Sequence, residues 1–147
     1  MRRFLNVLVI ALDPGNSTGY CYRNSEYPDK LFGGTLPENH SYVWNILNNL
    51  NPDIIIYETF QMYPGKAQKL IWNSFYPVEV IGVIKLWAMT HAKCTLVGLQ
   101  PAVKKFALAN SELELWKTVS IVDGTNKATE HTRDAVRLLR YYERNKK

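Results

Sequence analysis

One apolar run that stops on a carboxylate constrains the fold of this chain more than any other feature. Val7 to Leu12 are all apolar, and Asp13, Pro14 and Gly15 follow them directly. An unbroken apolar run is typical of a strand covered on both faces, and Pro-Gly turns the chain. The sequence therefore predicts a buried strand with Asp13 at the rim of a sheet. At this point Asp13 is either a functional acid or only the start of a turn.

A second run repeats this pattern. Ile54 to Tyr57 are apolar or aromatic and end on Glu58. Neighbouring parallel strands of an open sheet end on the same side, which is where such folds bind ligands. We therefore expect Asp13 and Glu58 at one edge of the sheet.

The remaining pattern predicts an antiparallel three-stranded meander, followed by parallel strands and helices. Pro77 is expected to break or restart a helix, and Gly82 to approach the sheet closely. The predicted strands after the first are 18–22, 30–36, 54–58 and 94–99, and the predicted helices are 41–50, 66–76, 78–91, 101–109, 111–120 and about 130–142.

Length and composition indicate an ordinary globular protein. The 147 residues suit a single domain, 1–147, and the net charge of +5 is weak evidence for a polyanionic partner. Cys21 and Cys94 lie far apart, so neither a disulfide framework nor a cysteine zinc site is expected, which favours a reducing compartment such as the cytoplasm. No apolar segment has the length of a membrane span, so we expect no membrane association.

The last predicted helix carries both acids and arginines. His131 and Asp134 are three residues apart and so share one helical face near the N-terminal end. The helix dipole alone would also favour an acid there. The same helix carries a basic ridge, which is either a solvated face or a binding surface, formed by Arg133, Arg137, Arg140 and Arg144.

Together these side chains form a set of hard metal ligands. Asp13, Glu58 and Asp134 supply carboxylates and His131 an imidazole, and carboxylates placed close together would repel one another without a cation. Two divalent ions about 3.5–4 Å apart can activate water and stabilise the leaving oxygen of a phosphodiester. A basic protein with an acidic, metal-binding hollow has the charge pattern of a nuclease.

These motifs, in this order, resemble the RuvC-type Holliday-junction resolvases of the RNase H-like superfamily. The resemblance covers about residues 5 to 142 and rests on the strand ending in Asp13-Pro14-Gly15 with Gly19, on Ile54 to Glu58, on Gln100 to Lys105, and on His131 with Asp134-Ala135. It implies an α/β fold with a five-stranded mixed sheet flanked by helices. It also implies cleavage of four-way DNA junctions with Mg²⁺ or Mn²⁺, two ions per site, by the catalytic residues Asp13, Glu58, His131 and Asp134.

The resemblance further implies where DNA and a second copy bind. Phe60 or Tyr63 would stack at the opened junction, and Lys104 and Lys117 match the family's basic positions. The other expected DNA contacts are Lys66, Lys69, Lys105, Arg133 and Arg137. The family implies a homodimer whose helix would lie within Gly65 to Trp87, with Trp72, Phe75 and Tyr76 exposed, and the short chain suggests a compact phage or viral relative.

Two other functions remain open on the sequence. The pattern from Asp13 to Gly19 also resembles the first phosphate loop of actin-like and sugar-kinase-like ATPases, although such proteins need a second lobe for which we expect no room. A non-catalytic DNA-binding relative would keep the basic ridge and only pack its acids.

Overall fold

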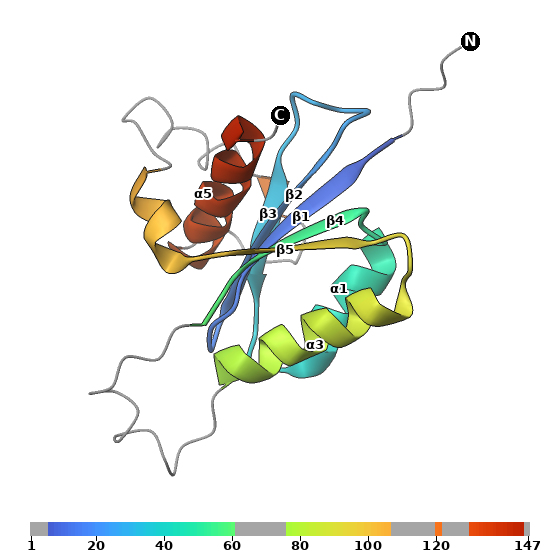
Figure 1. Cartoon of the computed structure of the whole chain (residues 1–147), viewed down its shortest axis with the longest axis vertical. Coiled ribbons are helices and arrows are strands. Elements are labelled where there is room, and N and C mark those ends of the chain that lie inside the picture. Colours follow the sequence, from blue (N-terminus) through green and yellow to red (C-terminus); the bar gives the residue numbers. More distant parts are fainter. Residues whose placement is uncertain (1–5, 61–75, 107–119, 122–129, 146–147) are drawn as a thin grey trace.

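The computed structural model describes residues 6–60, 76–106, 120–121 and 130–145. Their centre is a mixed sheet with the strand order β5-β4-β1-β2-β3-β6, in which β6 is the short edge strand Ser120–Ile121 (Figure 1). Strand β1 (Leu8–Asp13) lies in the middle, antiparallel to β2 (Thr18–Asn24) and parallel to β4 (Ile54–Glu58). Strand β3 (Phe32–Leu36) is antiparallel to β2, and β5 (Thr95–Leu99) is parallel to β4. The predicted five-stranded arrangement of a meander and parallel strands is therefore confirmed.

In the described part of the chain, three α-helices cover the sheet. Helices α1 (His40–Leu50) and α3 (Tyr76–Thr90) lie side by side on one face, and α5 (Glu130–Asn145) lies on the other (Figure 1). Local signals set the ends of α1, since the Asn39 side chain accepts a hydrogen bond from the Ser41 amide and Asn51 adopts a left-handed conformation with φ of 48°. Pro77 lies in the first turn of α3, where its fixed φ suits a helix start.

Alternation along the strands divides the core into two clusters. Ile10 and Leu12 of β1 pack on the side of α1 and α3, and Ala11 packs on the side of α5. Strand β4 does the same, with Ile55 facing α1 and α3 and Ile56 facing α5. The central strands are thus covered on both faces, as their unbroken apolar sequences predict.

Several predictions about individual positions were wrong. Gly82 does not approach the sheet: it is exposed, and a Cβ added there would meet nothing within 4 Å, because Ile81 and Ile84 occupy the face of α3 that meets the core. Tyr76 is buried rather than exposed, because it joins the core beside α1, where its ring meets the edge of His40 at 5.0 Å.

The last third of the chain also differs from the prediction. Ser120, predicted to end a helix, instead opens the two-residue strand β6 (Ser120–Ile121), which is parallel to β3 and was not predicted. The helix predicted over 101–109 is a 3-10 helix, η2 (Pro101–Phe106), as far as the described residues reach. The predicted helices 66–76 and 111–120 lie almost wholly outside the described residues. None of the described helices is long and apolar enough to cross a membrane.

Candidate active site

Asp13 and Glu58 end adjacent parallel strands on the same face of the sheet. Leu12 of β1 is the register partner of Tyr57 of β4, so each acid directly follows a paired residue. Each acid also lies two residues after a side chain of the cluster beneath α5, Ala11 in one strand and Ile56 in the other. Because side chains alternate along a strand, both carboxylates start from the α5 side of the sheet. Asp13 is 8% exposed and Glu58 is partly buried.

The first turn of α5 lies directly on the strand beside Asp13. Gly19 of β2 is the register partner of Asp13, and a Cβ added at Gly19 would overlap the carbonyl group of His131. Only glycine allows this approach of helix backbone to strand backbone. His131 and Asp134 therefore begin their helix at the edge where Asp13 and Glu58 end their strands.

Thr132 links the N-terminal turn of α5 to the sheet through a hydrogen bond. Its side chain is fully buried, and its hydroxyl donates a hydrogen bond to the Gly34 carbonyl oxygen at 3.0 Å. The Thr35 hydroxyl lies 3.2 Å from the same Thr132 oxygen. In the sequence, Gly19 is only one residue of a motif, and Thr132 has no expected role. A polar residue between His131 and the arginines gave no local sign that its hydroxyl would be buried against a strand.

A hollow opens beside Glu58. It has a volume of about 200 Å³, and its lining includes Pro14, Glu58, Phe60 and Pro101. Phe60 is 39% exposed. Thr59 closes the end of β4 against β5, because its amide donates to the Leu99 carbonyl oxygen at 2.8 Å. The rim at Glu58 therefore combines an acid with an exposed aromatic ring.

The four predicted metal ligands share an edge, but their side chains do not form a closed cluster in the described structure. Among the described residues, no group of three or more His, Cys, Asp or Glu side chains is close enough to hold an ion. An Asp134 carboxylate oxygen lies 3.3 Å from an Arg137 guanidinium nitrogen, and His131 is exposed. The donors themselves suit Mg²⁺ or Mn²⁺, which prefer carboxylate oxygens and accept an imidazole.

The predicted DNA contacts are described only in part. Phe60 lies in the hollow beside Glu58. Arg133 and Arg137 lie on α5 and are partly buried, and Arg137 pairs with Asp134 instead of standing as an isolated cation. Lys104 and Lys105 belong to η2, but the structure describes only their backbone. Tyr63, Lys66, Lys69 and Lys117 lie outside the described residues.

Comparison with solved structures finds junction resolvases. Over 94% of this chain and 95% of the other, the structure superimposes on Thermus thermophilus RuvC in complex with a Holliday junction substrate, with a TM-score of 0.63 and 16% identity. The fowlpox virus Holliday junction resolvase gives 0.61 and 15% identity, over 94% of this chain and 99% of that one. The yeast mitochondrial resolvase Ydc2 gives 0.56 and 13% identity, over 92% and 77%.

Comparison by sequence finds no match, either to a family model or to a curated protein. At 13–16% identity the structural likeness establishes the fold. The chain therefore has the RNase H-like fold of these resolvases, as its motifs predict.

Proposed function

We propose that the protein is a metal-dependent endonuclease that resolves four-way DNA junctions by hydrolysing phosphodiester bonds. One observation carries this proposal: Asp13 and Glu58 end adjacent parallel strands, and the helix bearing His131 and Asp134 begins against Gly19, the register partner of Asp13. The RNase H-like fold shared with solved junction resolvases supports the choice of substrate.

In this proposal Asp13, Glu58, His131 and Asp134 hold the divalent ions. When bound, two such ions supply an activated water and neutralise the charge on the leaving oxygen. The protein supplies the positions of the ligands. Asp13 is held by the central strand, Glu58 by the adjacent strand, and Asp134 by a helix whose first turn is fixed through Thr132. Arg137 pairs with Asp134 in the structure, and a bound cation would compete with this pair.

Phe60 is the aromatic residue that the proposal assigns to the opened junction, because it is exposed in the same hollow as Glu58. Planar rings stack on unpaired bases regardless of their sequence. Arg133 and the lysines predicted to contact DNA, Lys66, Lys69, Lys104, Lys105 and Lys117, would bind the backbone phosphates. Tyr63 stays the alternative stacking residue.

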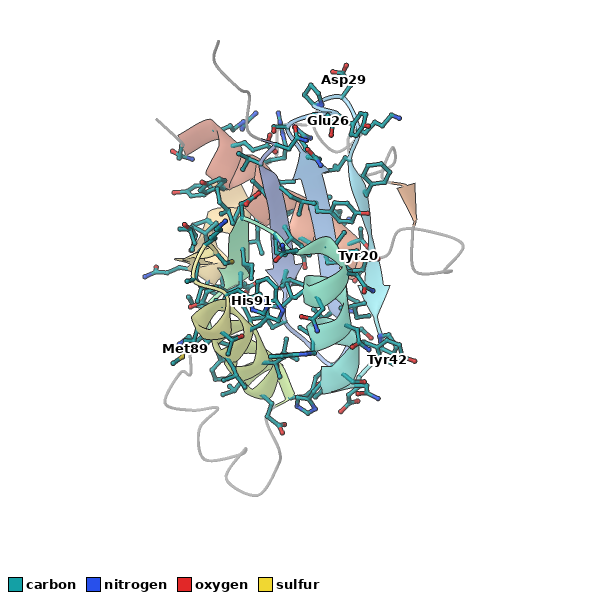
Figure 2. The ribbon with its side chains drawn as sticks, turned by 90° about the vertical axis from the view of Figure 1, so that its right-hand side faces the viewer. Tyr20, Glu26, Asp29, Tyr42, Met89 and His91 are labelled. Atoms are coloured by element: carbon teal, nitrogen blue, oxygen red, sulfur yellow. The ribbon has the colours of Figure 1, made fainter. Side chains whose placement is uncertain are left out.

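The outer face of α3 fits a second copy of the chain. Val78, Gly82, Leu86 and Met89 recur at helical spacing along the exposed side of α3, and the three larger side chains are 42%, 55% and 81% exposed. Met89 is labelled in Figure 2, and the exposed residues Glu79 and Lys85 border this face. Gly82 leaves open space at the centre of this face. Small residues allow close approach of two helix backbones, and contiguous exposed apolar side chains mark protein interaction sites. We assign this face to a homodimer, which would cut two strands of one junction.

The alternative hypothesis, that the protein is an actin-like or sugar-kinase-like ATPase, has less support. The hollow beside Glu58 is lined by this acid and three prolines, and none of its described lining residues is a cation that could bind a phosphate. A non-catalytic junction-binding relative would share the fold, so cleavage itself has to be measured.

The decisive assay uses a labelled four-way junction with Mg²⁺. The wild type should cut it, whereas Asp13→Asn and Glu58→Gln should lose at least about a thousandfold in rate, the scale expected when charge stabilisation in a phosphoryl-transfer site is removed. Asp29→Asn is the matched control, because Asp29 is exposed in the hairpin at the opposite end of the molecule (Figure 2). An inactive wild type, or an active Asp13→Asn, would refute the proposal, and ATP binding measured by calorimetry would favour the ATPase reading.

A further inference from the structure

A second hollow lies on the other face of the sheet, away from the acids. It has a volume of about 490 Å³, and its lining residues come mainly from α1 and from strands β2 and β3. Tyr20 of β2 and Tyr42 of α1, two of these residues, are labelled in Figure 2. Tyr20 belongs to the core cluster beneath α1 and α3, whereas Asp13 starts from the face covered by α5. This volume is within the range of sites that bind small organic ligands. The hollow plays no part in the proposed nuclease chemistry.

Aromatic residues of β2 line the side of the hollow that is formed by the sheet. Tyr20 and Tyr22 are two residues apart on β2, and their rings are parallel within 5° at 6.5 Å between centroids. Phe32 of β3 continues the stack, 5.3 Å from Tyr22. Tyr20 is almost fully buried, which fixes its ring. Burial also raises the pKa of Tyr22, so its hydroxyl stays protonated as a donor at neutral pH. Tyr20 is buried and closes the floor of the hollow, so a planar ligand would meet the partly exposed ring of Tyr22 and the exposed ring of Tyr42 on α1.

Helix α1, on the other side of the hollow, contributes side-chain amide groups. Tyr42, Asn45 and Asn49 follow one another on the exposed side of α1 at spacings of three and four residues. Within the described ranges, the side chains of these three residues form no hydrogen bond. Asn48, by contrast, accepts one from the Trp87 indole at 2.8 Å. Asn45 and Asn49 therefore keep amide donors and acceptors for a ligand.

The lining also limits what the ligand can be. None of the described residues that line the hollow is charged, so a phosphate group would find no cation there. Aromatic rings beside amides instead suit a neutral planar heterocycle that stacks on one side and hydrogen-bonds at its edge. Asparagine can bind adenine through two hydrogen bonds, to N6 and N7.

We propose that this hollow binds a nucleobase, with adenine preferred, which stacks against Tyr22 or Tyr42 and is held at its edge by Asn45 or Asn49. The base belongs either to a free nucleoside or to an unpaired nucleotide of a DNA strand, since both present the same ring. This inference stands apart from the nuclease proposal, because it uses none of the metal-site residues.

Titration of the full chain, followed by amide chemical shifts, tests the proposal. Adenosine should shift signals of β2 and α1, and it should bind more tightly than guanosine, cytidine or thymidine. Asn49→Ala and Tyr42→Ala should each weaken adenosine binding about tenfold, the scale of one lost stacking or edge contact. Tyr27→Ala is the control, because Tyr27 is 49% exposed, like Tyr42 at 48%, but lies outside the hollow.

A second arm identifies the source of the base. If the hollow takes an unpaired nucleotide, a short oligo-deoxyadenylate should bind more tightly than adenosine and shift the same signals. If it takes a free nucleoside, adenosine alone should bind there. Asp13→Asn should leave adenosine binding unchanged, which separates this result from the nuclease assay. The proposal is overturned if neither probe shifts β2 and α1, or if both variants bind adenosine like the wild type.

Discussion

Gly19 is the residue on which the geometry of the candidate site depends most. Its lack of a side chain allows the His131 backbone to lie against β2 beside Asp13. In Gly19→Ala the new methyl group would meet rigid backbone, so either the strand or the helix start must move. We predict a loss of about 1–3 kcal/mol in the free energy of unfolding, together with a large loss of cleavage.

Gly82→Ala should stabilise the protein, in contrast to Gly19→Ala. A Cβ at Gly82 would meet nothing within 4 Å, and alanine is the better helix former. The unfolding free energy should rise by about 0.5–1 kcal/mol in denaturant titration. If Gly19→Ala were as stable and as active as the wild type, the close contact between helix and strand would be refuted.

Cys21 gives a prediction for pH. Burial is the main cause that raises the pKa of its thiol far above the ordinary 9.0, and the nearby Glu143 acts in the same direction. The unfolded chain then releases this proton near pH 9 and the folded chain does not, so stability is present below pH 9 and declines above it. The decline attributable to Cys21 should approach about 1.4 kcal/mol per pH unit.

The measurement is the unfolding free energy from pH 7 to 10 in wild type and Cys21→Ala. The alanine variant should start less stable, because a buried side chain is shortened, but should lose less stability as the pH rises. Other groups titrate equally in both proteins, so equal slopes would contradict the burial of Cys21.

Single residues also show where sequence reasoning reaches its limit. Asp13 and Glu58 could be placed at one edge from sequence, because alternation and strand ends follow from local patterns. Gly19 and Thr132 could not be assigned their roles, because these arise where a distant helix meets the sheet. The Asp134–Arg137 pair is a matter of side-chain conformation, which helical spacing permits but does not determine.

At the scale of elements, Thr132 joins α5 to the strands that precede it by nearly a hundred residues in the chain. Its hydroxyl donates to the Gly34 carbonyl inside the protein. In Thr132→Val the shape is kept but that carbonyl loses its donor, which should cost about 1–3 kcal/mol in unfolding free energy. Thermal and denaturant unfolding measure this directly.

Thr132→Ser is the matched control for this bond. Serine keeps the hydroxyl and loses only a methyl group, so it should retain more stability and more cleavage than valine. If valine proved as stable as serine, packing rather than the hydrogen bond would hold the start of α5.

Elements with strong local patterns were predicted best. The strands of the central sheet, α1 and α5 were confirmed, because their apolar periods match their burial. Strand β6 was not predicted, since its two residues gain their structure from pairing with β3 and have too little sequence to form a pattern. The role of Gly82 was misjudged because α3 presents apolar side chains, Val78, Leu86 and Met89, on its exposed side as well as on its buried side.

At the scale of the molecule, the outer face of α3 predicts association. Leu86 is 55% exposed at the centre of this face. In the proposed dimer, Leu86→Glu would bury a charge against its own copy across the symmetry axis, which is strongly unfavourable.

We expect a wild-type dimer and a monomeric, folded Leu86→Glu in sedimentation equilibrium. Tyr42→Glu, an exposed change on α1 instead of α3, should stay dimeric. A monomeric wild type would exclude this interface.

The central claim is that the edge formed by β1, β4 and α5 binds catalytic metal, and anomalous diffraction from a crystal soaked in Mn²⁺ tests it most directly. We predict a strong anomalous peak bonded to carboxylate oxygens of Asp13, Glu58 and Asp134, and no such peak in Asp13→Asn. Mn²⁺ absent from that edge, or bound there without Asp13, would refute the assigned metal site.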